Sequence, residues 1–407
     1  MASRTRTNGH AKAERSLTPY EAAEKGFTDY WHPVGTSGDI SEKPKGIKFL
    51  GEAVMLLRRS GTVYALADEC AHRGTQLSLG KNEFPGTNTI ACRYHGWVWD
   101  LEDGRCLAAL TDGPDSPVVG RVRVRTYPVE ERKGIVWVWM GNEAPVPVED
   151  DVPRLLARDD TKIRVVKGLT YGNWRAHAEN IGYGHALMLH RDSIWVLTRQ
   201  NPAFMRNFTP YVSEDVDGEW VADRSEEIVR QAEYPGLGTW PTLKGKPWRY
   251  RKGGRLSTDL FGLKAFISLG LPGINRVLNF PLRGGIYYEF YVPVDEDHYR
   301  LWQITCTWPK NPLDAVWQAL RYYAWGRPAG VRRFIQQDKV MVRHSSDFAK
   351  RQGSYRPSPK IYRPDAFHAL WQDYANRTAR GVGLDVTSTN GTRSEAEAEP
   401  AEETHAL

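Results

Sequence analysis

Hydrophobic and polar positions divide the chain into two regions with different patterns. Between residues 28 and 152, apolar positions come in short runs separated by glycine-containing turns. Two such runs meet at Ser60-Gly61, and a second pair meets at Glu102-Asp103-Gly104, which is typical of β-hairpins. The aromatic and β-branched run Lys133–Gly141, KGIVWVWMG, predicts one more strand. The first region is therefore predicted to be a small all-β domain.

The pattern changes after residues 142–153, where three prolines and four acidic residues predict a linker. A helical segment at 173–193 is the first landmark of the second region, strand patterns then dominate, and helical spacing returns near the C-terminal end. The expected strands cover 261–273, 285–295 and 298–308, and the expected helices cover 313–343 and 364–377.

These patterns divide the chain into four parts. The two middle parts are the all-β domain at 28–152 and a larger mixed domain at 153–381. Residues 1–27 are expected to be a flexible N-terminal segment, whose basic start lacks the apolar run of a secretory signal. Residues 382–407 are rich in Glu and Ala and lack aromatic residues, so they are expected to form a disordered acidic tail.

Composition narrows the functional classes. The 407 residues are 41% hydrophobic and 26% charged, which is ordinary for a soluble globular protein of two or three domains. No apolar run reaches eighteen residues, so no membrane helix is expected, and the four cysteines suggest no disulfide framework, which fits a reducing cytoplasm. The net charge of +6 is spread along the chain, which disfavours nucleic-acid binding but suits docking of an acidic electron-transfer partner.

The strongest chemical signal is a pair of cysteine-histidine motifs. Cys70 and His72 form a Cys-x-His pair, and after nineteen intervening residues Cys92 and His95 form a Cys-x-x-His pair. A Rieske [2Fe–2S] centre takes two cysteines on one iron and two histidines on the other. The two motifs supply this ligand set.

A structural zinc site is the alternative, because two cysteines and two histidines also suit tetrahedral zinc. Zinc sites, however, usually pair like residues at short spacing. Each mixed pair here is also followed by a glycine, Gly74 or Gly96, which lets backbone amides approach the sulfur atoms. The mixed pairs therefore favour the iron–sulfur cluster.

A second candidate metal site lies in the larger domain. His185 and His190 flank the apolar sequence ALML, and Asp338 lies far downstream on an expected helix. Two histidines and one carboxylate form the facial triad of mononuclear Fe(II) oxygenases, which leaves positions open for O2 and substrate. Residues five apart on a helix point about 140° apart, so this site needs a distortion, which Gly182 and Gly184 would permit.

Spacing alone leaves another interpretation of these residues open. Two ordinary core or surface histidines and a solvated aspartate would give the same pattern. His177 lies about two helical turns before His185 and is expected to be structural.

Many short motifs in one order carry a resemblance to a known family. They run from about Phe27 to Asp338 and include DYWHPV, KFLGEAVMLLRRSGTVYALADECAHRGTQLS, YHGWVWDLEDG, TYPVEERKG, NWRAHAEN and HRDSIWV. With these motifs the chain resembles the catalytic α subunits of Rieske non-haem iron ring-hydroxylating oxygenases, and within them it is most similar to the carbazole dioxygenase terminal oxygenases.

The resemblance implies an α+β fold. A small all-β Rieske domain would accompany a catalytic domain in which a helix packs on a curved antiparallel sheet, the helix-grip or START-like arrangement. It implies one Rieske [2Fe–2S] cluster and one mononuclear Fe(II) per subunit of a head-to-tail homotrimer. Electrons would come from NAD(P)H through a ferredoxin reductase and a ferredoxin, and O2 and a small hydrophobic substrate would react at the Fe(II). The implied ligands are Cys70, His72, Cys92 and His95 for the cluster and His185, His190 and Asp338 for the Fe(II).

One departure from the family pattern concerns electron transfer. The family places an aspartate three residues before the first iron histidine, where it links the cluster of one subunit to the iron of the next. Gly182 occupies that position here, and its neighbour Tyr183 is not a carboxylate. Glu179 and Asn180 are the nearest polar candidates for an electron-transfer bridge.

The sequence thus predicts an oxidoreductase that uses O2 to hydroxylate or dihydroxylate a hydrophobic aromatic or heteroaromatic substrate. Residues between about Gln200 and Cys306, rich in aromatic side chains, are expected to line its pocket. The missing aspartate leaves oxidative C–H functionalisation or cyclisation in biosynthesis as an alternative. The alternatives of other classes are an electron-transfer Rieske protein with a decayed second site and a zinc-stabilised binding module. Iron content separates the oxygenase from the electron carrier, since the enzyme needs about three irons per chain and the carrier about two.

Overall fold

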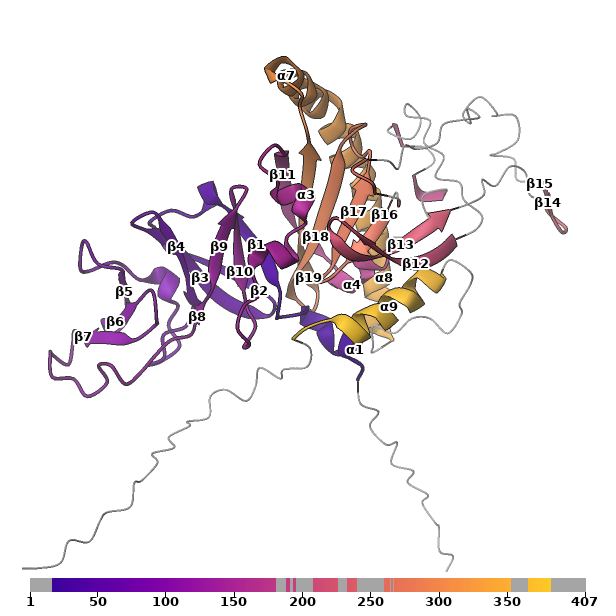
Figure 1. Ribbon diagram of the computed structural model, residues 1–407. Helices are drawn as coiled ribbons and strands as arrows, with labels where there is room; N and C mark the ends of the chain where they lie inside the picture. The colour runs from indigo at the N-terminus through magenta and orange to yellow at the C-terminus, as the bar shows by residue number, and fades with distance from the viewer. Residues whose placement is uncertain are drawn as a thin grey trace, which may run out of the picture.

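The computed structural model describes residues 17–180, 188–190, 193–194, 208–225, 233–239, 260–263, 265, 267–352 and 365–381. An N-terminal domain built from strands lies beside a larger domain in which helices accompany a seven-stranded sheet (Figure 1). The predicted α+β fold class is confirmed. The predictions for residues 1–16, for His185 and for the tail 382–407 fall outside the described residues.

The N-terminal domain contains three antiparallel sheets. Its strands are β1 (Trp31–Thr36), β2 (Lys45–Phe49), β3 (Glu52–Arg59), β4 (Thr62–Ala67), β5 (Thr89–Ala91), β6 (Trp97–Asp100), β7 (Cys106–Ala109), β8 (Thr126–Tyr127), β9 (Val129–Arg132) and β10 (Ile135–Trp139). They pair in the orders β1-β10-β9, β2-β3-β4-β8 and β5-β6-β7, and 3-10 turns lie at Ser37–Asp39 and Leu77–Leu79. Both hairpin turns predicted from the sequence are present, between β3 and β4 and between β6 and β7.

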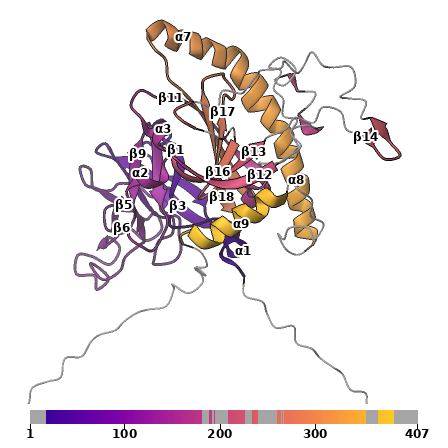
Figure 2. The ribbon, with the colours of Figure 1, turned by 45° about the vertical axis from the view of Figure 1, so that its right-hand side comes forward.

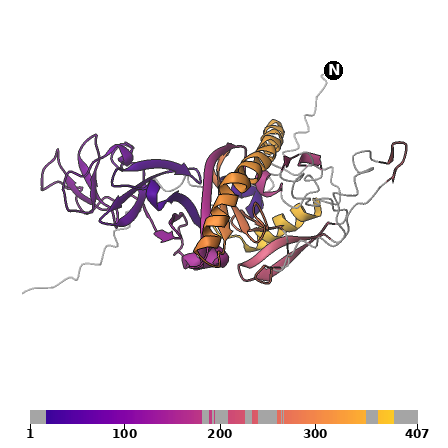
Figure 3. The same cartoon turned by 90° about the horizontal axis from the view of Figure 1, so that it is seen from above.

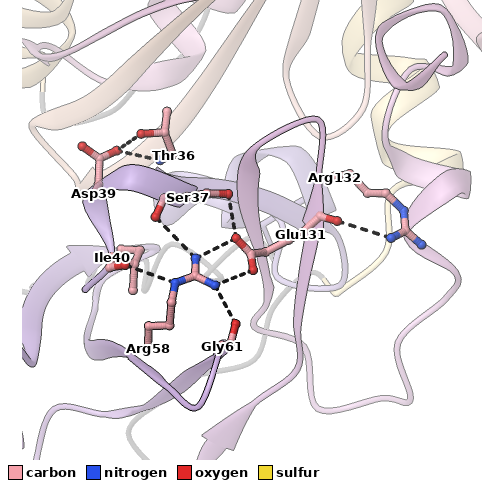
Figure 4. A network of polar contacts seen from close by, with 8 residues as sticks. All are labelled: Thr36, Ser37, Asp39, Ile40, Arg58, Gly61, Glu131 and Arg132. Carbon is pink, nitrogen blue, oxygen red and sulfur yellow. Dashed lines mark hydrogen bonds and ion pairs between the residues drawn. The ribbon is translucent and has the colours of Figure 1, made fainter. Parts of the chain in front are cut away.

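A polar cluster around Arg58 ties two of these sheets together (Figure 4). Arg58 on β3 donates two hydrogen bonds of 2.8 Å to the carboxylate of Glu131 on β9. The same guanidinium donates to the carbonyl oxygens of Gly61, Ile40 and Ser37. Because one planar group joins two loops and two strands, it fixes how the sheets lie against each other.

The larger domain is organised around one antiparallel sheet with the order β11-β19-β18-β17-β16-β13-β12. These strands are β11 (Lys162–Tyr171), β12 (Phe208–Asp215), β13 (Gly218–Ser225), β16 (Ile267–Gly270), β17 (Ile274–Leu278), β18 (Ile286–Asp295) and β19 (His298–Thr307), and β14 (Glu233–Tyr234) pairs with β15 (Gly238–Thr239) separately. The predicted strands at 285–295 and 298–308 are confirmed, whereas only four residues of the predicted strand 261–273 form β16.

The described helices are short except for three near the C-terminal end. They are α1 (Pro19–Ala22) with a 3-10 turn at Ala23–Lys25, α2 (Val148–Asp151), α3 (Arg154–Ala157), α4 (Trp174–Ala178), α7 (Pro312–Arg321), α8 (Ile335–Arg351) and α9 (Ala366–Thr378). A π-helical segment, Tyr322–Phe334, joins α7 to α8, so the three form one long rod beside the sheet (Figure 2). No helix among the described residues is long and apolar enough to cross a membrane.

The two faces of the sheet serve different purposes. On β18, Tyr287 and Tyr291 belong to the core beneath the helices, whereas Tyr288 and Phe290 belong to a core shared with the N-terminal domain. In that shared core the ring of Phe290 lies 5.5 Å from the ring of Trp137 on β10. The N-terminal domain therefore projects from one side of the larger domain (Figure 3) but packs into it through a common core.

The prediction of a flexible segment at 1–27 is wrong for its last residues. Tyr20 and Phe27 are buried, and their rings lie 6.1 Å and 5.7 Å from the ring of Trp174. The backbone amide of Tyr20 also donates to Asn376 on α9. Burial of these two aromatic side chains holds the segment against the larger domain.

Two predicted segments have different extents. The linker predicted at 142–153 contains α2, because Val148 and Val152 are buried among its acidic residues. The helix predicted at 173–193 is interrupted, since α4 ends at Ala178 and a turn follows. The helix predicted at 313–343 is confirmed and continues to Arg351. The domain boundary between residues 152 and 153 stays a prediction.

Candidate metal centres

Two loops of the same construction carry the cysteine-histidine motifs. The first follows β4, and the second joins β5 to β6. In each loop the glycine four residues after the cysteine donates its N–H to the cysteine carbonyl oxygen, at 2.8 Å for Gly74 and Cys70 and 3.0 Å for Gly96 and Cys92. Both glycines have positive φ, 69° and 67°, a conformation that favours glycine. The two loops therefore present their side chains from matching turns.

The four side chains of these loops separate by type. Cys70 and Cys92 are buried and their thiols interact, and burial, followed by the charge of Cys92, raises the pKa of Cys70 to about 11. His72 and His95 are partly exposed, and their ring centroids lie 4.6 Å apart. The loops thus offer a cysteine pair inside and a histidine pair at the surface, which is the division of ligands in a Rieske centre.

A buried nitrogen atom of His72 also indicates that the two histidines could bind a metal. Nδ1 of His72 is buried and has no hydrogen-bond partner among the described residues. A buried polar atom without a partner is unfavourable, and coordination to iron would satisfy it. The indole of Trp97 stacks flat on the His72 ring, at 4.7 Å between centroids and 2° between planes, and fixes the ring's orientation.

The second candidate centre lies between the helices and the sheet, at the start of α8. His190 and Asp338 are 1% and 4% exposed, and Nε2 of His190 lies 3.2 Å from Oδ1 of Asp338. Nδ1 of His190 lies 2.8 Å from Oε1 of Gln337, and Phe334 stacks on the imidazole at 3.6 Å. Nδ2 of Asn180 donates to Oδ1 of Asp338 at 3.0 Å.

These contacts suit a cation. In the tautomer in which Nδ1 of His190 is protonated, this N–H donates a hydrogen bond to Gln337. Nε2 then presents its lone pair beside the Asp338 carboxylate. Two electron-rich atoms that converge in a buried place are the usual donors for iron. Within the described ranges, no three His, Cys, Asp or Glu side chains form a group that could hold one metal ion, and His185 lies outside those ranges.

The two candidates for the electron-transfer bridge point in different directions. Asn180 contacts Asp338, as described above. The carboxylate of Glu179 instead accepts hydrogen bonds of 2.9 Å from Tyr20 and from Gln372 on α9. His177 is buried with Nδ1 2.5 Å from the hydroxyl of Tyr299, as a structural histidine would be.

Three contacting residues were missed by the sequence reasoning: Trp97, Gln337 and Phe334. The sequence signal that could have identified them is their closeness in the chain to the proposed metal ligands. Trp97 follows His95 by two residues, and Gln337 directly precedes Asp338. Phe334 stands one helical turn before Asp338, at the end of the π-helical segment. Such segments are frequent at functional sites.

Comparison with known families gives two matches. The Rieske [2Fe-2S] domain matches residues 30–128, and the homotrimeric ring hydroxylase family matches residues 139–383. Among curated proteins, the terminal oxygenase component of carbazole 1,9a-dioxygenase from Sphingomonas sp. is 35% identical over 375 residues, which cover 89% of this chain and 95% of the relative. The corresponding component from Metapseudomonas resinovorans is 35% identical over 297 residues, 71% of this chain and 74% of the relative.

Solved structures show the same likeness. A carbazole-bound oxygenase in complex with the ferredoxin of carbazole 1,9a-dioxygenase superposes with a TM-score of 0.77 at 27% identity, covering 92% of this chain and 96% of the other. The terminal oxygenase of carbazole 1,9a-dioxygenase from Nocardioides aromaticivorans IC177 gives a TM-score of 0.74 at 29% identity, covering 89% and 98%.

Proposed function

Because the chain belongs to the homotrimeric ring hydroxylases that carry a Rieske [2Fe-2S] domain, we propose that it is a terminal oxygenase that uses O2 to hydroxylate or dihydroxylate a hydrophobic aromatic or heteroaromatic substrate. The observation that carries the proposal is the buried pair of His190 and Asp338 in a chain that also pairs Cys70 with Cys92. A protein that only carries electrons would not need the pair of His190 and Asp338.

When bound, the cluster would supply electrons one at a time, and the Fe(II) would supply the site for O2 activation. The residues around them hold the ligands in place. Trp97 packs against His72, and Gln337 fixes which nitrogen of His190 carries a proton. The proposed ligands are Cys70, His72, Cys92 and His95 for the cluster and His185, His190 and Asp338 for the Fe(II).

Asn180 is the better candidate for the role of the family's missing aspartate. Its amide already touches Asp338, whereas the carboxylate of Glu179 is held by Tyr20 and Gln372. In a head-to-tail trimer, the partly exposed edge of His95 on one subunit would approach Asn180 of the next. The site would then be complete only between subunits.

The redox partners follow from the relatives. Solved neighbours include complexes of the oxygenase with its ferredoxin. A ferredoxin, reduced by NAD(P)H through a reductase, is therefore the proposed electron donor. A cytoplasmic location is supported by the four free, buried cysteines.

The proposal is tested with the purified protein, a ferredoxin, its reductase and NADH or NADPH. We expect a red-brown protein with about three irons per chain, and a product of a tricyclic aromatic substrate such as carbazole or fluorene that carries oxygen from labelled O2. A colourless protein that contains zinc would refute the assignment. A coloured protein with about two irons that oxidises no member of an aromatic panel would indicate an electron carrier.

Gly182, in place of the family's aspartate, favours a second candidate reaction, oxidative C–H functionalisation or cyclisation. The same assay separates the two reactions. A product that has lost two hydrogens and gained no labelled oxygen would support cyclisation, whereas one or two labelled oxygen atoms would support hydroxylation or dihydroxylation.

A further inference from the structure

Several buried polar atoms near the start of the π-helical segment have no hydrogen-bond partner. Within the part of the chain that the structure describes, they are Oγ1 of Thr305 on β19, the hydroxyl of Tyr322, Nε of Arg327 and Oε1 of Gln318. Thr305 and Tyr322 are 0% and 1% exposed. Such atoms are rare in folded proteins, so a group of them indicates that ordered water or a ligand fills the space beside them.

Two arginines lie next to the Tyr322 side chain. The guanidinium carbon of Arg164 on β11 lies 5.3 Å from the centre of the Tyr322 ring. Burial raises the pKa of Tyr322, and the Thr305 hydroxyl opposes that rise. The charges of Arg327 and Arg164 oppose it too, so both guanidinium groups lie near the phenol.

The charge of these two arginines is not neutralised by the protein around them. Among the described residues, no carboxylate pairs with Arg164 or Arg327, and Arg164 donates to Oγ1 of Thr307 at 3.0 Å. Partly buried guanidinium groups usually have an anionic partner. The cluster therefore has the charge and the donors for an anion.

A row of aromatic rings connects this cluster to the proposed Fe(II) site. The Phe334 ring, which stacks on His190, lies 5.4 Å from the ring of Phe280. The Phe280 ring lies 4.9 Å from the ring of Tyr287, which is paired with Thr305 between β18 and β19. Ring faces beside the iron and positive charge at the other end suit a flat aromatic molecule that carries a negative group at one end.

We propose that Arg164 and Arg327 bind the carboxylate of an aromatic acid substrate, with the hydroxyls of Tyr322 and Thr305 as further donors. The inference rests on the proposed function, because it names the substrate class of that oxygenase. A carboxylate accepts several hydrogen bonds, and charge-assisted hydrogen bonds are about twice as strong as neutral ones. It therefore satisfies the donors of the cluster, and an ordered water can donate to Oε1 of Gln318.

The test compares the isomeric fluorene carboxylates with the matching carboxamides, by isothermal titration calorimetry of the iron-loaded trimer without O2. The amide keeps the shape of the acid but has no charge. We expect at least one acid to bind about 10- to 100-fold more tightly than its amide. Arg164→Gln and Arg327→Gln should each reduce this preference.

The matched control is Arg332→Gln. Arg332 lies in the same π-helical segment but is exposed, so its replacement should leave the preference unchanged. Tyr322→Phe removes one hydroxyl and keeps the buried ring, so it gives the answer if an arginine variant does not fold. It should weaken binding of the acid and leave binding of the amide unchanged.

If no acid binds more tightly than its amide, or if the preference survives both arginine substitutions, the inference is overturned. Inorganic phosphate is titrated separately. If phosphate binds through the two arginines while no acid is preferred, the cluster holds a free anion and the substrate assignment is wrong. Turnover with ferredoxin, reductase and NADH tests the proposed function by itself: a preference for the acid without oxidation of any aromatic compound would refute that function and leave the anion site in place.

Discussion

Nε2 of His190 lies 3.2 Å from Oδ1 of Asp338, although 148 residues separate them in the chain. The contact exists because α8 lies across the sheet and delivers its first turn to the segment that follows α4. Asn180 and Gln337 then hold the two side chains from either side. The pair is buried, so a bound cation would meet little competition from water.

Replacement of Asp338 by alanine should remove one iron and leave the cluster intact. A site with open coordination positions depends strongly on each protein ligand. Iron should fall from about three to about two per chain, with an unchanged cluster spectrum and no substrate oxidation. The matched control is Asp347→Ala. Asp347 lies on the same helix, but its carboxylate accepts a hydrogen bond from the hydroxyl of Tyr171 and is not a proposed iron ligand. Full iron and turnover in Asp338→Ala would show that Asp338 is not the carboxylate ligand.

Asn180→Ala should slow electron delivery while most of the iron remains bound. The variant loses the amide that touches Asp338, and such supporting contacts are typically worth about 10- to 100-fold. The measurement is the rate of cluster oxidation in prereduced protein mixed with substrate and O2. Glu179→Gln should keep that rate, because its side chain faces Tyr20 and Gln372. Equal rates in wild type and Asn180→Ala would exclude Asn180 as the bridge.

Complementation between inactive variants tests transfer between subunits. His95→Ala should lack an intact cluster, and Asp338→Ala should lack the Fe(II). Co-expressed with two different tags and purified through both, mixed trimers should regain part of the wild-type rate, because some interfaces join an intact cluster to an intact Fe(II) site. Mixed trimers as inactive as either parent would place the transfer within one subunit.

Gly104→Ala should destabilise the N-terminal domain more than Gly61→Ala. Both glycines have positive φ, 75° and 86°, so both substitutions strain the backbone by about 1 kcal/mol or more. A Cβ at Gly104 would lie 2.0 Å from the carbonyl oxygen of Val124, whereas a Cβ at Gly61 meets nothing within 4 Å. We therefore expect a larger fall of the thermal midpoint for Gly104→Ala than for Gly61→Ala. Equal midpoints would show that the loop relaxes around the added atom.

His32 should make stability depend on pH below neutrality. The imidazole is buried with Nε2 2.8 Å from the carbonyl oxygen of Phe27, and burial lowers its pKa from 6.5 to about 4. The unfolded chain therefore binds a proton that the folded chain rejects, and stability is lost as the pH falls from about 6.5 to about 4, by about 3 kcal/mol. The measurement is the thermal midpoint between pH 5 and 7.5. His32→Gln should flatten this dependence, and an equally steep profile in that variant would assign it to other groups.

Local sequence signals account for much of this architecture. The Cys-His motifs with their glycines, the turn at Gly61 and the nearly continuous apolar run of β18 depend on neighbours in sequence, so sequence reasoning finds them. Tertiary contacts decide the rest. The helix predicted beyond Ala178 ends where the Glu179 carbonyl oxygen meets His368, which lies 189 residues away. The fixed N-terminal segment depends likewise on the distant Trp174.

Other differences between the sequence-based predictions and the structure have physical causes that the hydrophobic pattern does not reveal. The hydrophobic pattern does not predict β11, because Lys162, Arg164 and Lys167 interrupt its apolar positions at the sheet edge. The opposite directions of Glu179 and Asn180 depend on which partner each side chain meets. The contact of Asp338 with His190 required the placement of α8 and could be proposed from the sequence only through the family resemblance.

The core that joins Trp137 to Phe290 has a consequence for the evolution of this chain. A Rieske domain cut out at residue 152 would expose the aromatic face that now packs against β18, so the fragment would aggregate instead of serving as a diffusible carrier. The Rieske domain therefore depends on the larger domain of the same chain to cover this face. Recombination that exchanged this module between relatives would have to exchange the matching face of the large sheet with it.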